Sequence, residues 1–189
     1  MAENYEPTEQ SLSGESIPSG MSVRLGSDGM TYPIGFIQIA FNHTNGNAVG
    51  GMLVTDNTGI PLEFMITSAV RPTRPQRILY GERLKSYVAV DLCAKELITH
   101  IKTAPKVIFV RDAYLLDAVK LTSIPLLMLQ RVEALGANAP KPTVVAPPGK
   151  SAYEKVVDLS SLHTDMVDAF DRIEKCREVL AEAKEEYRI

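Results

Sequence analysis

IGFIQIAFNHTNGNAVGGMLVTD, residues 34–56, is the stretch that decides the fold. Both of its ends are short, apolar and rich in β-forming residues, which predicts strands over 34–41 and 48–56. Asn45-Gly46 lies between them and tolerates the positive φ angles of a tight turn. Gly50-Gly51 indicates a bulge or a close backbone contact within the second strand. The stretch therefore predicts a β-hairpin.

The chain extends this hairpin on its C-terminal side. Asn57-Thr58-Gly59 predicts a second tight turn and residues 60–70 a third strand, so the three strands should form an antiparallel meander. A helical pattern begins at Thr73 or Pro75 and runs to about Thr103. Its apolar stripe contains Tyr80, Leu84, Tyr87, Ala94, Ile98 and Ile101, with Asp91 among them.

The remaining part of the domain predicts a second helix between two buried strands. Residues 106–110 and 125–129 are apolar without alternation, and residues 111–119 suit a short helix. Strands without alternation are expected where helices cover both sheet faces. The sequence thus predicts an α/β fold of order β-β-β-α-β-α-β, with a mixed five-stranded sheet: an antiparallel meander followed by parallel strands.

Composition divides the chain into four parts. Residues 1–30 are acidic and rich in Ser, Gly and Pro, which predicts a disordered tail. Residues 31–133 form the predicted α/β domain, residues 134–157 a Pro-rich linker, and residues 158–189 an amphipathic helix.

The C-terminal segment carries an apolar seam typical of a coiled coil. Its positions alternate by three and four residues. This stripe needs burial, either on its own domain, on a second copy of the chain, or on another protein. We expect an intermolecular interface, formed by Leu162, Met166, Ala169, Ile173, Cys176, Leu180, Ala183 and Tyr187.

Composition also limits the cellular setting and the chemistry. Hydrophobic residues make up 45% of the 189 residues, enough for a core, and the net charge of −3 gives no overall preference for nucleic acid. The two cysteines, Cys93 and Cys176, lie in helical apolar patterns and are predicted to be buried thiols. The start of the chain has no signal-peptide pattern, and no apolar run suits a membrane span, so we expect a cytoplasmic protein.

The sequence contains no strong catalytic motif. Walker, G-x-G-x-x-G, C-x-x-C, H-E-x-x-H and G-x-S-x-G patterns are absent, and the three histidines are not spaced as metal ligands. This absence, beside a long tethered seam, favours a non-enzymatic interaction or assembly subunit that oligomerises or binds a partner protein through its C-terminal helix, without a cofactor. Catalysis is left open but is not favoured.

A family resemblance supports a second hypothesis. The element order over residues 34–130, with Val107-Ile108-Phe109-Val110-Arg111-Asp112, resembles the ribonuclease H-like superfamily. The resemblance implies two divalent metal ions, such as Mg²⁺, held by carboxylates on the first strand, the first helix and the end of the fourth strand. The matching positions are Asp112 at the fourth strand, Glu82 or Asp91 on the helix, and Asn42 where the first strand would need an acid. An inactive relative is therefore expected.

Asp112 and Asp91 also have structural interpretations. Asp112 follows a strand and could cap the next helix. Asp91 could bind a metal, pair with an arginine, or lie at the solvent edge of its stripe.

A basic run suggests how such a relative would bind nucleic acid. It contains Arg71, Arg74, Arg77, Arg83 and Lys85, with Glu82 as the single acid among them. These residues could contact a phosphate backbone, an acidic protein surface, or only solvent and neighbouring side chains. The second hypothesis is thus a nucleic-acid-binding protein or metal-dependent nuclease of ribonuclease H-like type.

Overall fold

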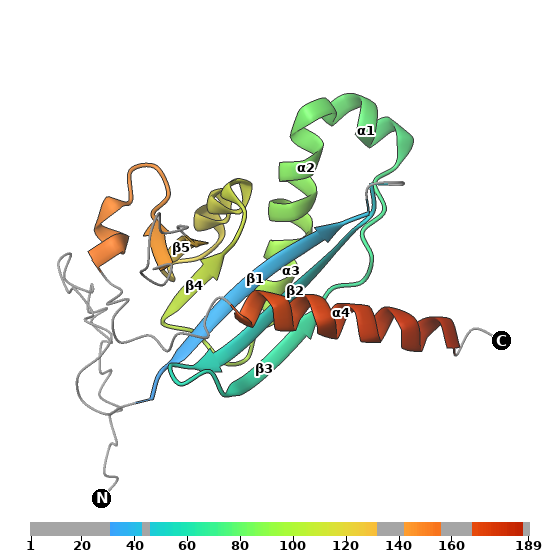
Figure 1. Cartoon of the computed structure of the whole chain (residues 1–189). Helices are drawn as coiled ribbons and strands as arrows, with labels where there is room; N and C mark the ends of the chain where they lie inside the picture. The colour runs from blue at the N-terminus through green and yellow to red at the C-terminus, as the bar shows by residue number, and fades with distance from the viewer. Residues whose placement is uncertain (1–30, 43–45, 132–141, 156–167, 187–189) are drawn as a thin grey trace, which may run out of the picture.

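A computed structural model describes residues 31–42, 46–131, 142–155 and 168–186 (Figure 1). The tail predicted for residues 1–30, the interface residues Leu162, Met166 and Tyr187, and the side chain of Ala183 lie outside this description. Among the described residues, no helix is long and apolar enough to cross a membrane.

One mixed sheet organises the domain. Its first three strands, β1 (Pro33–Phe41), β2 (Ala48–Asp56) and β3 (Pro61–Ile66), form the predicted antiparallel meander. Strands β4 (Val107–Val110) and β5 (Leu126–Arg131) run parallel to β1. The prediction of a meander followed by parallel strands is confirmed.

Across the described residues the sheet has six strands, one more than predicted. The extra strand, β6 (Pro142–Val145), pairs antiparallel with β5 and completes the order β3-β2-β1-β4-β5-β6. It lies within the segment that the sequence marks as a Pro-rich linker. An edge strand tolerates proline because one of its sides needs no ladder partner, and Thr143, Val144 and Val145 suit a strand.

The helical segment between β3 and β4 begins where the sequence predicts. Thr73 caps α1 (Arg74–Tyr80) in a reciprocal capping box. The Gln76 backbone N–H donates to the Thr73 hydroxyl at 3.4 Å, and the Thr73 backbone N–H donates to the Gln76 side-chain carbonyl at 2.8 Å. Gly81, at φ 50°, then interrupts the α-helix. The chain continues through η1 (Gly81–Arg83), α2 (Leu84–Ser86), η2 (Tyr87–Ala94) and α3 (Lys95–His100).

The predicted apolar stripe of this segment is partly wrong. Tyr80 and Leu84 are not buried, whereas the buried side chains include Val88, Ala89 and Leu97. Tyr80 lies in the exposed helix α1, which ends at Gly81, and the later η2 is a π-helix. Its hydrogen bonds join residues five apart, so each turn holds more residues than an α-turn and the buried face shifts along the sequence.

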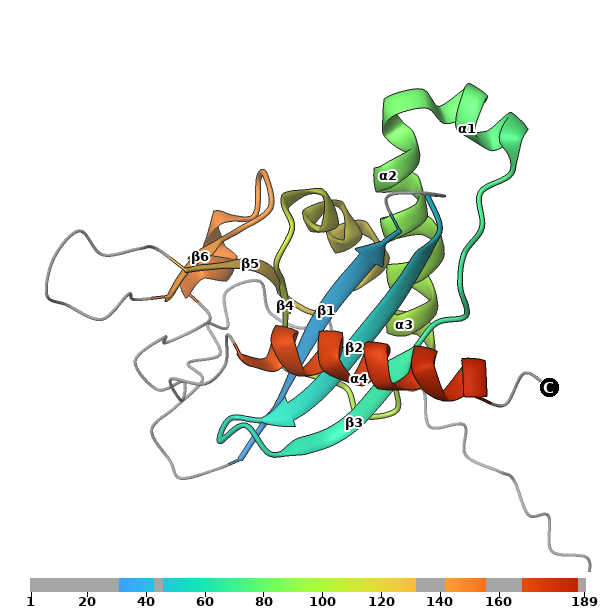
Figure 2. The ribbon, with the colours of Figure 1, turned by 45° about the vertical axis from the view of Figure 1, so that its right-hand side comes forward.

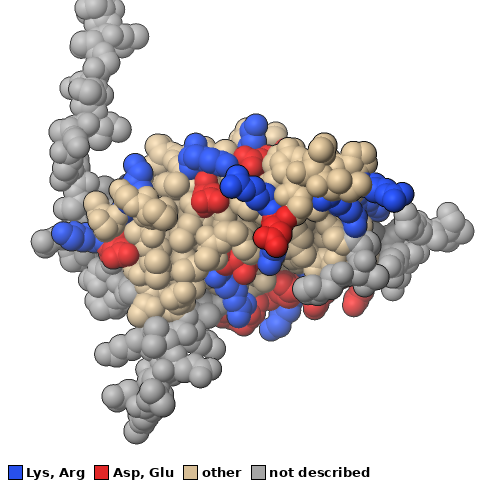
Figure 3. Space-filling model, turned by 90° about the horizontal axis from the view of Figure 1, so that it is seen from above, with Lys and Arg blue, Asp and Glu red and all other residues tan. Residues whose placement is uncertain are grey.

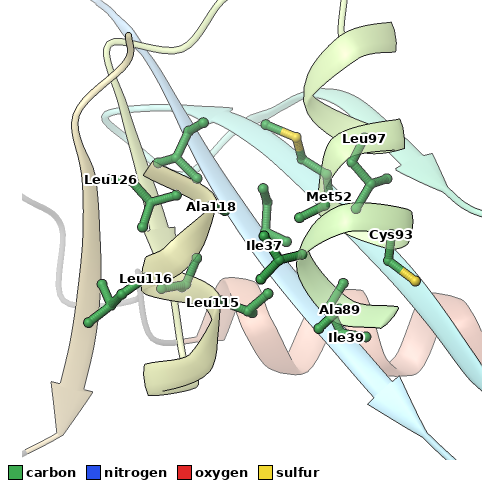
Figure 4. Packing of buried hydrophobic residues seen from close by; sticks show 14 of the residues in the cluster. Ile37, Ile39, Met52, Ala89, Cys93, Leu97, Leu115, Leu116, Ala118 and Leu126 are labelled. Atoms are coloured by element: carbon green, nitrogen blue, oxygen red, sulfur yellow. The ribbon is translucent and has the colours of Figure 1, made fainter. Parts of the chain in front are cut away.

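Two apolar cores lie on opposite faces of the sheet. On one face, β1 and β2 pack against η2, α3 and the 3₁₀-helix η3 (Ala113–Leu121). Figure 4 shows Ile37 and Ile39 of β1 beside Ala89 and Cys93 of η2. Burial raises the pKa of the Cys93 thiol to about 11, so the predicted buried thiol stays protonated.

The helix α4 (Asp168–Glu186) covers the opposite face (Figure 2). Its buried side chains Ala169, Phe170 and Ile173 pack on β1 and β2, and the Phe170 ring meets the Phe36 ring edge-on at 5.6 Å. Past this contact the helix extends along the sheet with exposed residues. Cys176, predicted to be buried, is one of them, because it lies beyond the turn of α4 that meets the sheet.

Candidate nucleic-acid interface

The segment α1–η1–α2 forms an arm at the end of the molecule where β1 terminates (Figure 1). No residue of α1 is buried, and Ile78 and Leu79 are 72% and 81% exposed. Pro72 and the N-cap Thr73 lie at the start of the arm, and Gly81, at a positive φ, ends α1 within it. We define this arm as residues 71–86.

The predicted basic residues all lie on the arm, and all are exposed. Among the described residues, no carboxylate forms a salt bridge with Arg71, Arg74 or Arg83. Figure 3, which views this end of the molecule from above, shows Lys and Arg side chains spread across it with some acidic ones between them. The arrangement leaves several cations available to an anionic ligand.

Arg77 differs from the other basic residues because it anchors the arm. Its Nε donates to the Pro72 carbonyl at 3.1 Å. Its guanidinium lies over Gly46 in the β1–β2 turn, with Nη1 3.5 Å from where a Cβ on Gly46 would sit. Arg77 therefore holds the arm against the hairpin, in addition to any contact with a ligand.

Lys85 lies over two aromatic rings at the base of the arm. Its Nζ is 5.5 Å from the ring centroid of Phe41, at the end of β1, and 4.7 Å from that of Tyr114, in η3. The two rings meet edge-on at 6.3 Å. An ammonium over ring faces is stabilised by their negative electrostatic potential, so this geometry fixes the cation's position.

Asp112 also lies in this cluster. Its Oδ2 accepts a hydrogen bond from the Tyr114 hydroxyl at 3.1 Å. Burial, and then the Asp112 charge, raise the pKa of that hydroxyl, so it remains a donor. Asp112 occupies the N-cap position of η3, but its side chain makes no capping hydrogen bond to the backbone there. The carboxylate thus binds a side chain and does not cap the helix.

Of the other predicted site residues, Asp91 lies apart, whereas Asn42 and Glu82 lie beside Lys85. Asp91 forms a salt bridge from its Oδ1 to Lys120 Nζ at 3.2 Å, which realises the pairing interpretation with a lysine in place of an arginine. Asn42 and Glu82 line one shallow hollow together with Lys85. Over the described part of the chain, no three His, Cys, Asp or Glu side chains are close enough to hold a metal ion.

The strand order is the observation that decides the fold type. A meander ordered β3-β2-β1 is followed by β4 and β5 parallel to β1, with helices on both faces, as the resemblance implies. The fold is ribonuclease H-like. This form of the fold adds an edge strand, β6, and a helix, α4, across the second face.

Several solved structures are similar to this ribonuclease H-like domain. They include human ENDOV at 16% identity, a TM-score of 0.43 and coverage of 57% of this chain and 50% of the other. Endonuclease V from Bacillus subtilis is 16% identical, has a TM-score of 0.42, and matches over 57% of this chain and 48% of its own. Endonuclease V from Ciona intestinalis, in a structure with a 23mer DNA containing inosine, is 13% identical, has a TM-score of 0.39, and matches over 55% of this chain and 47% of its own.

The chain spans about half the length of the structures it matches. No protein-family model matches its sequence, and no curated protein is significantly similar.

The hypothesis of an assembly subunit that oligomerises or binds a partner through a coiled-coil helix is wrong. It assumed that the C-terminal seam needs another protein for its burial. Instead, Ala169, Phe170 and Ile173 are buried on the sheet of their own chain. The seam does not continue past the contact, since Leu180 is 39% and Val179 63% exposed.

Sequence reasoning missed Phe41 and Tyr114 as parts of the site. Phe41 looks like the last residue of an apolar strand, and Tyr114 like one residue of a short helix. Neither pattern indicates that their rings meet around Lys85. The parallel pairing of β1 with β4 brings the ends of these strands together, and with them Phe41 and Tyr114. A sequence pattern alone does not give this pairing.

Proposed function

We propose that this chain is a ribonuclease H-like domain that binds nucleic acid through its basic arm, without an assembled metal site for cleavage. The observation that supports it is the set of exposed cations on the arm with no salt-bridge partner among the described residues: Arg71, Arg74, Arg83 and Lys85. Such cations displace counterions from a phosphate backbone, which favours binding.

Two acidic residues of the sheet strands, Asp56 and Glu63, accept hydrogen bonds away from the arm, which supports this proposal. The Glu63 carboxylate accepts hydrogen bonds from the backbone amides of Lys102 and Thr103 at the other end of the sheet. The Asp56 carboxylate accepts bonds from Thr58 and Ile60 in the β2–β3 turn. These hydrogen bonds lower the pKa of both carboxyls and keep their charges away from the arm.

The triple replacement of Arg71, Arg74 and Arg83 by glutamine is expected to weaken binding of a fluorescein-labelled oligonucleotide about 10- to 100-fold at low salt. Each lost phosphate contact should also reduce the slope of log K against log salt by roughly 0.7–0.9. Fluorescence anisotropy of full-length protein across a salt series measures both quantities, on single-stranded and duplex DNA and RNA.

A matched control removes three exposed cations from elsewhere on the domain. Lys95, Lys102 and Lys106 change to glutamine, so the net charge falls by the same amount as in the arm variant. At 0.1 M salt, where the two variants are compared, we expect this control to bind within about threefold of the wild type, because long-range charge effects are screened over roughly 10 Å there. Equal losses in both variants would show that binding depends on net charge and not on the arm.

Cleavage is expected to be absent. The wild type in Mg²⁺ or Mn²⁺ should degrade the oligonucleotide no faster than Asp112→Asn, because the described residues bring together no group of three His, Cys, Asp or Glu side chains that could hold metal ions. A gel-based time course with both proteins, each purified in parallel, makes the comparison. Metal-dependent cleavage by the wild type that Asp112→Asn abolishes would instead establish a nuclease.

A further inference from the structure

We infer that the Lys85 ammonium takes the place of a bound metal ion at the ends of β1 and β4, and that it binds a phosphate of the nucleic acid without a divalent cation. The inference rests on the proposed function and specifies its chemistry. In two-metal nucleases, the phosphate at the reaction centre is held by metal ions. The described residues do not fit such ions, because β1 carries no carboxylate, Asp112 is bound by Tyr114, and Lys85 brings a positive charge to the same place.

The strand β1 offers no ligand for a metal. Side chains alternate along a strand, and Ile37 and Ile39 point into the helix-side core, so Phe41 is the next residue on that face. None of these three side chains is a carboxylate, and Asn42, where the resemblance would need an acid, is an amide. The neighbouring Gln38 points to the other face, where its amide donates to the Glu174 carboxylate at 2.8 Å.

Asp112 alone cannot replace this missing set. Val110 pairs with Ile37 in the parallel ladder, so Asp112, two residues later, lies just past the ladder on the helix side. Its carboxylate is engaged by the Tyr114 hydroxyl at 3.1 Å. Mg²⁺ takes near-octahedral oxygen ligands, usually several waters with one or two carboxylates and substrate phosphates, and two such ions need more carboxylate oxygens than Asp112 supplies.

Lys85 supplies a fixed positive charge at the same place. The rings of Phe41 and Tyr114 hold its Nζ from below, at 5.5 and 4.7 Å from their centroids. Ring faces orient an ammonium but do not use up its three N–H donors. Lys85 is exposed and makes no salt bridge with the described carboxylates, so these donors are available to phosphate oxygens.

Lys85 lies close to the arginines of the arm and beside a shallow hollow. The shallow hollow at its base is lined by Phe41, Asn42 and Glu82 as well as Lys85. Arg83 lies on the neighbouring turn of the arm. A nucleic-acid strand whose phosphates contact the exposed arginines would therefore reach Lys85 next. Glu82 is the acid in the hollow, and it separates the two mechanisms: it would assist a metal ion but repel a phosphate.

The test uses full-length protein and the fluorescein-labelled oligonucleotide across a salt series, with MgCl₂ and EDTA solutions matched in ionic strength at each point. We expect the wild type to bind in EDTA at least as tightly as in MgCl₂. Lys85→Met, which keeps the apolar stem over the rings, should weaken binding about 5- to 10-fold and lower the salt slope by about 1. Lys85→Arg, which keeps the charge, should restore most of the affinity. Glu82→Gln should bind as tightly as the wild type or more tightly.

Two results would overturn the inference while leaving the proposed function in place. One is a loss of wild-type binding in EDTA together with weaker binding by Glu82→Gln, which would indicate a metal ion. The other is unchanged affinity and salt slope in Lys85→Met while the arginine triple variant still loses binding. Failure of the wild type to bind any of the four nucleic acids would overturn the proposed function and the inference together. Thermal unfolding of each variant confirms that the differences are not caused by misfolding.

Discussion

Phe170→Ala is expected to lower the free energy of unfolding by about 3–5 kcal/mol. The Phe170 side chain is 1% exposed and packs edge-on against Phe36, whose ring also contacts Phe109 at 5.7 Å. Removing the ring leaves a cavity between α4 and the sheet, and the surrounding strands can fill it only in part. Urea unfolding followed by circular dichroism measures the change.

Val179→Ala provides the control within the same helix. Val179 is 63% exposed, so its truncation should change stability by less than about 0.5 kcal/mol. Light scattering on both variants separates packing within one chain from association between chains. If Phe170→Ala left the stability unchanged but dissociated an oligomer, α4 would be packing on another copy, contrary to the structure.

Gly51→Ala is expected to lower the free energy of unfolding by about 1–3 kcal/mol. A Cβ at this position would lie 2.5 Å from the Cγ2 of Ile173, well inside van der Waals contact. The branched side chain of Ile173 is stiff, and it is 2% exposed, so relief requires a movement of α4. The substitution also reduces the freedom of the unfolded chain, a stabilising effect of about 0.4–1 kcal/mol, which the clash should exceed.

A double-mutant cycle isolates this contact. Ile173→Ala removes Cγ2 and should cost about 2–5 kcal/mol by itself, as a buried truncation. Once that methyl group is absent, adding Gly51→Ala should cause little further loss. Additivity of the two changes within about 0.3–0.5 kcal/mol would show that Gly51 and Ile173 do not meet, and the docking of α4 described here would then be incorrect.

The meander and the alternation of helices and strands could be predicted because local patterns determine them. Asn57-Thr58-Gly59 and the apolar runs on either side of it are read within a few residues, and the structure places turns and strands there. The start of α1 at Thr73 was similarly accessible, since a capping box is a property of four adjacent residues.

The phase of the helical stripe could not be predicted in the same way. An α-helical period was assumed across Tyr87–Ala94, where the chain adopts a π-helix that fits Val88, Ala89 and Cys93 against β1 and β2. The choice between the two helices depends on the packing partner, which lies far away in the sequence. The same reason explains β6: Pro142–Val145 becomes a strand because β5 offers it an edge.

By itself, the sequence determined the ribonuclease H-like order of elements, the lack of a first-strand carboxylate, and the basic run from Arg71 to Lys85. These follow from residue type and short-range spacing. Only the tertiary structure decided that α4 covers its own sheet, that Asp91 pairs with Lys120, and that Lys85 lies over Phe41 and Tyr114. Each of these contacts joins segments far apart in the chain, and the pairing of β1 with β4 and the packing on the two sheet faces bring those segments together.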